Sequence, residues 1–567
     1  MTILEKFALI FFGFLLFLVV FIRFGFLLGS PIGSLTLVFA LLIYCTGLSS
    51  AFSLLIKKTQ EKVSSFLALG LFLGTLALLI PVTLLLSNTF DTSWDGQGYH
   101  QTAIIALSNS WNPIWEPAIQ FKQELPSQIF AEGYPSALWE IQATIYSLTG
   151  KINSAKVTNI AIAIIAAAFV FALLRRISIG KIPSLFFMLL ITIQPVYLIQ
   201  LLTFMQDGFG YELLVLSAAT LAIYIVQPKA QWAAAAFLLA ELLLASSKYS
   251  NLPVTAVLFV IFIPVFLNRL MNRDFRFKKQ TVSFIVVYVF LALVFAYLPY
   301  GRNLIAHKAM FYPTDDPQLM GAVKYNNIPL NIKDENKLTL LFYGIFSRSQ
   351  TAQSGDPTNP SNVANLKIPY TFSPDEVTDG AALYNNRVGG AGPLFSGIVL
   401  TVLAFIIFAS KKASGAKERY AGYAAVFGSF VILVLALLAP TPNLLRYVNQ
   451  LQLLPFAMLV PIYAVYKKKY VKIVTGVLLM LMAVNIGMYT TSVTLRNVKE
   501  TGLVNAEFKS MRNSGKQYGV RAQQFYSSYI VLKEQNVKFR IADSLKCEKM
   551  NSMVASSTTT HYCEMEN

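Results

Sequence analysis

The chain has 567 residues, of which 55% are hydrophobic and only 13% are charged, with a mean hydropathy of +0.56. A soluble globular protein carries roughly 25% charged residues, so this composition excludes that class and predicts a polytopic membrane protein. The formal net charge of +18 does not indicate nucleic-acid binding. Much of the excess lies in short clusters at alternate ends of apolar segments, which is typical of cytoplasmic loops.

Thirteen apolar segments are predicted to cross the bilayer as helices. In chain order they are 7–28, a second ending near 56, 63–86, 155–174, 182–202, a sixth from Asp207 to just before 227, 232–246, an eighth ending near 269, 281–298, a tenth ending at 411, 420–438, a twelfth ending at 467, and 471–489. This number places the long polar segments 88–154 and 301–392 on one side, together with the tail 496–567. The densest Lys and Arg clusters fall on the other side, which is therefore cytoplasmic.

The predicted fold is an all-α polytopic membrane protein with about 13 transmembrane helices, two large extracytoplasmic loops and a small soluble C-terminal tail. The expected location is the bacterial plasma (inner) membrane, with the long loops outside. Cys547 and Cys563 both lie in the tail. In an oxidising compartment they can pair, and closing a loop of roughly 15 residues stabilises the tail by about 3 kcal/mol.

The stretch 90–100, Phe-Asp-Thr-Ser-Trp-Asp-Gly-Gln-Gly-Tyr-His, follows closely on the third apolar segment. Two carboxylates, a tyrosine and a histidine therefore lie where a predicted transmembrane helix meets water. These residues are Asp91, Asp95, Tyr99 and His100. Acidic side chains at such an edge usually face a cavity or a partner, because entering the lipid is costly. The alternative is a polar loop whose carboxylates are solvated caps.

Four further charged residues lie at helix ends on the same predicted side, although the densest charge clusters lie on the opposite, cytoplasmic side. Asp207 opens the sixth segment, Lys248 follows the seventh, Arg302 follows the ninth, and Arg446 precedes the twelfth. For any one of them the alternative is a snorkelling or capping charge. As a set they predict one pocket at the extracytoplasmic membrane boundary that gathers both signs of charge.

Carboxylates in such a pocket suit a general base or a divalent-cation site, for which Asp95 and Asp207 are the candidate ligands. Cations there suit a phosphate group that arrives in the membrane. The sequence leaves the cofactor open, with a divalent metal as the candidate.

Several motifs resemble the GT-C superfamily of integral-membrane glycosyltransferases, in the branch of the protein O-mannosyltransferases and the lipid A aminoarabinose transferase. The first-loop acids are followed by Tyr-His at 99–100, and Lys-Tyr-Ser-Asn-Leu-Pro at 248–253 resembles the branch's Lys-Tyr-Thr-Gly-Leu pattern. Arg-Asn at 302–303, with Met-Phe-Tyr-Pro at 310–313, is similar to its Arg-Asn…Asn-Pro-Phe-Tyr-Pro element. Arg-Tyr at 446–447, with Leu-Pro at 454–455, is similar to a late Arg-Tyr…Leu-Pro element.

The resemblance implies a GT-C-like bundle and divides the chain accordingly. Two extra N-terminal helices occupy 1–62, and a transmembrane core occupies 63–300 and includes the first outer loop, 88–154. A large extracytoplasmic loop at 301–392, C-terminal transmembrane helices at 393–495 and an extracytoplasmic tail at 496–567 complete the chain.

The implied activity moves a sugar from a polyprenyl-phosphate carrier to a glycan, lipid or protein acceptor outside the membrane. The implied base is Asp95, which closely precedes Tyr99 and His100, with Asp91 as the second candidate. The first loop departs from the mannosyltransferases in lacking their adjacent Asp-Glu pair. Asp207 would help to hold a metal or the acceptor. The remaining substrate-binding residues are Lys248, Arg302 and Arg446 near the phosphate, with Tyr99 and His100 beside the base.

Other classes of membrane protein also carry charges on helices. A transporter or flippase would show paired, broken helices near the middle of the membrane, often in repeated halves. A lipid-linked polysaccharide ligase or polymerase would depend on outer arginines and histidine more than on a first-loop acid. In a non-catalytic scaffold, replacing Asp95 by Asn would leave glycan profiles unchanged.

Overall fold

The computed structural model describes residues 1–121, 126–272, 275–349, 363–378, 386–545, 547, 550–556 and 559–565. Every predicted segment is helical. The bundle consists of α1 (Ile3–Leu27), α2 (Thr36–Leu55), α3 (Thr59–Leu86), α7 (Val157–Arg176), α8 (Lys181–Thr192), α9 (Pro195–Gln200), α10 (Asp207–Val226), α11 (Gln231–Ala245), α12 (Leu252–Met271), α13 (Phe275–Ala296), α18 (Phe395–Lys411), α19 (Ala416–Leu438), α20 (Leu454–Val465) and α21 (Lys469–Asn513). Within the described residues, nine helical segments are long and apolar enough to cross a membrane. The protein is therefore a polytopic helical membrane protein.

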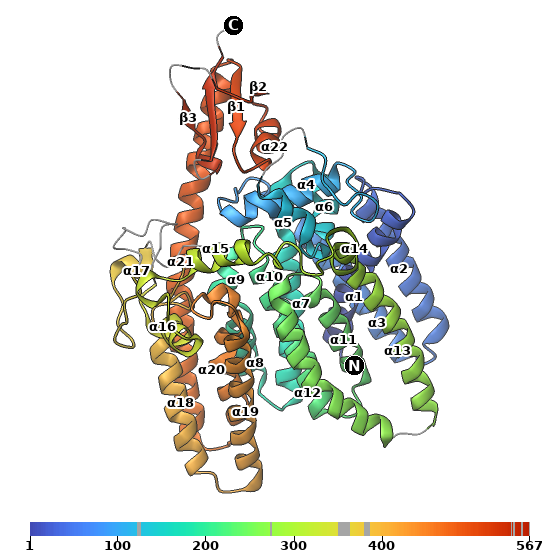
Figure 1. Ribbon diagram of the computed structural model, residues 1–567. Coiled ribbons are helices and arrows are strands. Elements are labelled where there is room, and N and C mark those ends of the chain that lie inside the picture. Colours follow the sequence, from blue (N-terminus) through green and yellow to red (C-terminus); the bar gives the residue numbers. More distant parts are fainter. Residues whose placement is uncertain are drawn as a thin grey trace.

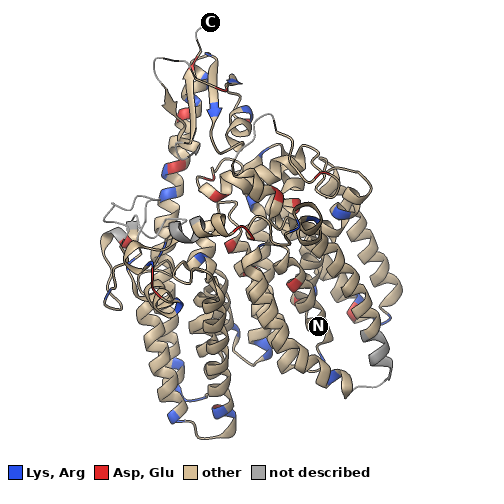
Figure 2. Cartoon of the chain, in the orientation of Figure 1, with Lys and Arg blue, Asp and Glu red and all other residues tan. Residues whose placement is uncertain are grey.

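Both long loops and the C-terminal tail lie at the same end of the bundle, the upper end in Figure 1. We call this end the tail side. The first loop forms η1 (Gly96–His100), α4 (Gln101–Ser108), α5 (Gln128–Gly133), α6 (Ala137–Thr149) and η2 (Ile152–Lys156); the second forms η4 (Tyr297–Gly301), α14 (Arg302–His307), α15 (Pro317–Asn327), η5 (Leu330–Ile332), α16 (Lys337–Phe346) and α17 (Pro374–Thr378). Short 3-10 helices η3 (Tyr249–Asn251), η7 (Leu445–Tyr447) and η8 (Asn449–Leu453) complete this layer. Figure 2 shows Lys and Arg at the opposite, lower helix ends, as the sequence predicts.

The segment 182–202 is two helices and not the single span that its hydropathy predicts. The helix α8 ends at Thr192, and α9 begins at Pro195. Proline disfavours a helical conformation in the residue before it but fits the first turn of a helix, so the chain breaks there. Side chains satisfy the freed backbone groups: the Tyr211 hydroxyl donates to the Ile191 carbonyl (2.5 Å), and Gln452 Oε1 accepts from the Val196 amide (3.1 Å).

The tail adds a small sheet that the all-α prediction did not include. Its strands β1 (Tyr518–Ala522), β2 (Phe539–Ile541), β3 (Asn551–Ser552) and β4 (Thr560–Glu564) are arranged in the order β2-β1-β4-β3 beside α22 (Ser527–Glu534), with a further 3-10 turn, η9 (Val554–Ser556). Strand β1 is parallel to β2 and antiparallel to β4. Strands β2 and β3 have only three and two residues, too few to show a two-residue hydrophobic period in the sequence.

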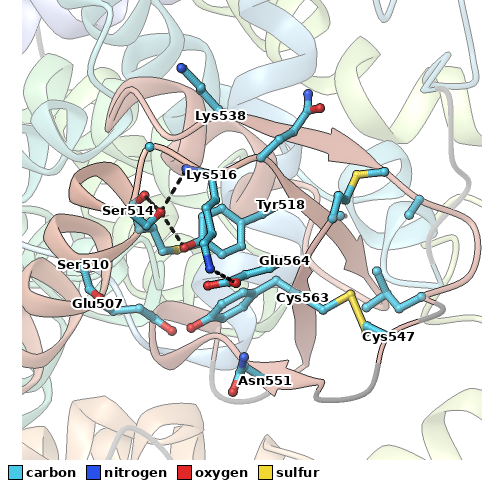
Figure 3. A pocket seen from close by; sticks show the side chains of 18 of the residues that line it. Glu507, Ser510, Ser514, Lys516, Tyr518, Lys538, Cys547, Asn551, Cys563 and Glu564 are labelled. Carbon is cyan, nitrogen blue, oxygen red and sulfur yellow. Dashed lines mark hydrogen bonds and ion pairs between the residues drawn. A yellow bond between two sulfur atoms is a disulfide. The ribbon is translucent and has the colours of Figure 1, made fainter. Parts of the chain in front are cut away.

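The helix is not interrupted at the predicted boundary 495/496. Helix α21 is 45 residues long in all, about 68 Å at 1.5 Å per residue, and runs without interruption from the bundle into the tail. The predicted pairing of Cys547 and Cys563 is confirmed, with their Cα atoms 6.3 Å apart. Figure 3 shows this disulfide beside a hollow of about 1790 Å³ that is lined by side chains of α21 and of the tail sheet.

A buried ion pair ties the first helix to the loop layer. Arg23 of α1 contacts Glu140 of α6 (2.9 Å), and both side chains are almost fully buried. Arg23 also donates to the carbonyls of Val294 and Phe295 in α13, each at 3.0 Å, and the Ser136 hydroxyl donates to Glu140 at 2.6 Å. A buried charge is tolerated only when it is paired and hydrogen-bonded, so this network fixes α1, α6 and α13 relative to one another.

The tail docks on the first loop through Glu534, which is largely buried. Its carboxylate accepts from the Ile152 amide (2.9 Å), and the Lys151 ammonium donates to its backbone carbonyl (2.7 Å). Burial raises the pKa of Glu534 from 4.5 to about 7, against the opposing effects of the Ile152 amide and the Lys151 charge. The protonated carboxyl is therefore the form that the docked tail favours.

We expect the tail to become less stable as Glu534 ionises. A carboxyl whose pKa is raised by folding contributes stability that is fully present below about pH 4.5 and lost as pH rises through about 7, here up to about 3 kcal/mol. The measurement is thermal unfolding of the purified protein at pH 5 and pH 8. Glu534→Gln keeps a hydrogen-bond acceptor without the charge and should reduce the difference between the two midpoints. Identical pH dependence in both proteins would contradict this assignment.

Candidate active site

Asp95 lies immediately before η1, a single turn of π-helix that opens the first loop. Such turns occur often at functional sites because they redirect side chains. The Asp95 carboxylate accepts a hydrogen bond from Arg446 Nη1 at 2.5 Å, and the two side chains are 16% and 9% exposed. Arg446 lies in η7, 351 residues further along the chain.

A second ion pair joins Lys248 to Asp207 at the start of α10. Asp207 also accepts from Gln200 Nε2 of α9 (3.1 Å), and its own backbone carbonyl accepts from Asn449 in η8 (3.1 Å). The break between α8 and α9 thus places Gln200 beside the acid that opens the next helix. Asp207 is buried, whereas Lys248 is 12% exposed.

The two ion pairs belong to one group of side chains, which we call the ion-pair cluster: Asp95, Asp207, Lys248 and Arg446. The ring of Tyr447 lies between the two cations, with Lys248 Nζ and the Arg446 guanidinium each 5.1 Å from its centroid. The Arg446 charge also acts on Asp207. The cluster has two charges of each sign, drawn from four separate parts of the sequence.

Tyr99 and His100 pack beside the cluster, as predicted. Their rings are 4.2 Å apart, and Trp139 Nε1 donates to His100 Nδ1 at 2.9 Å. Burial lowers the pKa of His100 to about 3, more than the nearby Asp95 raises it. The imidazole is therefore neutral, with its proton on Nε2. Burial also raises the pKa of the Tyr99 hydroxyl well above its ordinary value, so that it is a neutral hydrogen-bonding group.

Arg446 keeps its charge in spite of its burial. Burial, the largest single effect, lowers the pKa of its guanidinium, but Asp95, Tyr447, Asp207 and Tyr99 together outweigh it and raise the pKa well above its ordinary value. Its Nε atom is buried and has no hydrogen-bond partner among the described residues. A fully charged guanidinium with an unused donor suits a phosphate oxygen.

Asp91, the second candidate for the base, lies apart from the cluster. Its carboxylate accepts from the backbone amides of Ser93 (2.8 Å) and Phe204 (2.7 Å), and the Lys156 ammonium acts on it electrostatically. Burial raises the pKa of Asp91 against these contacts. A Cβ atom at Gly96 would overlap the Asp91 carboxylate, so only glycine fits there. Asp91 thus anchors the first loop to the connection between α9 and α10.

Arg302 lies in a separate group of residues, away from the ion-pair cluster. It donates to Asn303 Oδ1 (3.1 Å), and its guanidinium lies 5.9 Å from the Trp111 ring. Like Arg446, it has a buried Nε with no partner among the described residues. Aromatic contacts connect the two groups: the Tyr134 ring lies 5.4 Å from that of Tyr99 and 5.5 Å from that of Tyr249.

The residues present do not fit the divalent metal for which Asp95 and Asp207 are the candidate ligands. Each of these carboxylates is already paired with a cation, Arg446 or Lys248. Over the described part of the chain, no group of three or more His, Cys, Asp or Glu side chains is placed to hold a metal ion. A cation bound between the acids would have to displace two ion pairs.

Sequence reasoning missed several residues that build this site. Gln200 and Trp139 hold Asp207 and His100, and Glu132 acts electrostatically on Arg302. Their sequence positions carry no signal, because apolar or loop residues surround them. Tyr447 could have been predicted from the sequence, because it directly follows Arg446 in the Arg-Tyr element.

Comparison with known proteins gives one similar structure. No protein-family model and no curated protein matches the chain. The crystal structure of ArnT from Cupriavidus metallidurans in the apo state is similar over 81% of this chain and 94% of that chain, with 12% sequence identity and a TM-score of 0.30. The fold and the site together define a polytopic helical membrane protein with a cluster of paired acids and cations on its tail side.

We expect Asp91→Ala to destabilise the protein by about 3 kcal/mol, because it leaves two buried amides without an acceptor and the Lys156 charge without its neighbour. Asp91→Asn, which keeps one acceptor oxygen, should lose less. Chemical denaturation in detergent measures both variants. A fully stable Asp91→Ala variant that has lost activity would instead make Asp91 the base.

Proposed function

We propose that this protein is a glycosyltransferase that moves a sugar from a polyprenyl-phosphate carrier to an acceptor on the extracytoplasmic side of the membrane. The observation that carries the proposal is the ion-pair cluster, in which one partly exposed carboxylate, Asp95, meets a charged guanidinium with an unused donor. The resemblance of the sequence motifs to the GT-C superfamily supports the same activity. The bacterial inner membrane, with the tail side outward, is the corresponding location.

In the proposed reaction Asp95 acts as the general base. It accepts the proton of an acceptor hydroxyl as that oxygen attacks the anomeric carbon of the sugar. The bond from the anomeric carbon to the phosphate oxygen breaks, and the carrier phosphate leaves with the bonding electrons. A single displacement of this kind inverts the anomeric centre. The acceptor is a glycan, a lipid or a protein with a free hydroxyl.

The cations act on the leaving phosphate. Negative charge develops on its oxygen as the bond breaks, and preorganised donors stabilise that charge without further reorganisation. Arg446 and Arg302 each have a buried Nε free of partners among the described residues, and Lys248 adds an ammonium that is 12% exposed. In the resting protein the carboxylates neutralise Arg446 and Lys248, so the binding phosphate would replace part of those contacts.

We expect Asp95→Asn to lower sugar transfer by a factor of about 10² to 10⁴, because the amide cannot accept the proton. The measurement compares lipid-linked sugars and surface glycans in cells with the wild type, the variant and no protein. Accumulation of the lipid-linked donor in the variant is the expected result. Asp334→Asn, at an exposed carboxylate in the second loop, is the matched control and should behave as the wild type. Retained transfer by Asp95→Asn would remove Asp95 from this role.

We expect Arg302→Ala and Lys248→Ala to weaken capture of the phospholipid carrier by about 10- to 100-fold each, the loss of one charge-assisted hydrogen bond to phosphate. The measurement is binding of a polyprenyl phosphate to the purified variants. Lys337→Ala, at an exposed lysine of α16, is the control. Carrier affinity equal to that of the wild type in both variants would refute the phosphate site.

A further inference from the structure

The C-terminal tail contacts residues on both sides of Asp95, through the side chains of Thr92 and Trp94 and the carbonyl of Gln97. The tail residues follow the first loop by some 400 positions in the sequence. Their side chains and carbonyls nevertheless form four hydrogen bonds with that loop. We call the stretch 90–100 the Asp95 loop. Its contacts with the tail involve Phe90, Thr92, Trp94 and Gln97, which lie within five residues of Asp95.

Helix α21 holds the N-terminal part of the Asp95 loop. The Thr92 hydroxyl donates to Glu500, which is also paired with Arg496 at 2.6 Å. The ring of Phe90 packs on that of Phe508, with the centroids 5.7 Å apart and both rings buried. These contacts fix the chain between α3 and Asp95 to the part of α21 that lies in the tail.

The segment after β1 holds the residues that flank Asp95. Trp94 Nε1 donates to Gln524 Oε1 at 2.9 Å, and the Trp94 ring meets the edge of Phe525, with the centroids 5.9 Å apart. On the other flank, the Ser527 hydroxyl donates to the Gln97 carbonyl at 3.3 Å. The residue before Asp95 and the second residue after it are thus both bound to a four-residue stretch of the tail.

Ser127 connects the same stretch to the next residue of the loop. Its hydroxyl lies 3.0 Å from the Gly98 carbonyl and 3.1 Å from the Gln524 carbonyl, so it can donate to both carbonyls in one bifurcated contact. The Phe525 ring is fully buried, 3.4 Å from the position of a Cβ atom at Gly98. A Cβ atom there would make ordinary van der Waals contact with that ring, so the Phe525 ring lies next to the Gly98 backbone.

We propose that the tail is a working part of the active site, in which Gln524 is a positioning residue that holds the Asp95 carboxylate in register with Arg446. This proposal rests on the proposed function, since it assigns a partner to the proposed base. Asp95 lies at the start of a helical run that continues through η1 into α4, and the irregular segment 90–93 precedes it, so no helix fixes the chain on its N-terminal side. A displacement of about 1 Å at a reacting group can cost 10²-fold in rate. The contacts on both flanks prevent such a displacement.

The test compares Gln524→Leu with Gln524→Glu in the full-length protein. Leucine removes the acceptor for Trp94 Nε1, whereas glutamate keeps an oxygen in the same place. We expect amides 95–98 to exchange hydrogen about tenfold faster in the leucine variant, and sugar transfer to fall at least tenfold. The glutamate variant should stay within twofold of the wild type in both measurements. Lys516→Ala, which breaks the exposed pair with Glu564 elsewhere on the tail, is the control and should change neither.

The outcomes separate this proposal from the proposed function. Unchanged exchange in Gln524→Leu, or faster exchange with full transfer, would overturn the positioning role. Equal losses in the leucine and glutamate variants would also overturn it, because they would indicate a general loss of tail structure. If the wild type transfers no sugar but exchange rises only in the leucine variant, the hold on the Asp95 loop stands and the sugar-transfer proposal fails.

Discussion

The ion pair between Asp95 and Arg446 is the contact on which the tail side of the molecule depends. It joins the first loop to the connection before α20, and Tyr447, the next residue, brings the pair of Asp207 and Lys248 against it. Charges that are removed from water at the edge of a membrane must be paired, and here each acid has one cation. That requirement brings four distant segments together, and the helices that carry them take their relative positions from it.

Rigid contacts on either side support this cluster. Asp91 binds the backbone at Phe204 and so holds the Asp95 loop against the turn that ends in Asp207. Arg23 and Glu140 tie α1 to the helix that carries Trp139, and Trp139 holds His100. The two aspartates of the first loop therefore differ in role, although they are only four residues apart. Asp91 is satisfied by backbone amides, whereas Asp95 is held by an arginine that keeps an unused donor.

The balance of charge in the cluster is consistent with the proposed chemistry. Asp95, the proposed base, is partly exposed and lies against the Arg446 guanidinium. In the proposed reaction the same guanidinium would serve both the base and the phosphate of the lipid carrier. Arg302 lies beyond the aromatic rings of Tyr134 and Tyr249, in a second group of residues.

The amino-acid sequence by itself determined the membrane class, the thirteen helical segments and the placement of both long loops and the tail on one side. It could do so because hydropathy and the positions of Lys and Arg are local properties of each segment. It also predicted which charged residues lie at helix ends on the side away from the main Lys and Arg clusters. Of these, Asp95, Asp207, Lys248 and Arg446 do meet. Only the tertiary structure decided that Asp91 and Arg302 lie outside that cluster. It also decided that Pro195 breaks a predicted span, and that the tail forms a sheet and rests on the Asp95 loop. These features depend on which side chain fills each hydrogen bond between segments hundreds of residues apart, and no local pattern encodes that pairing.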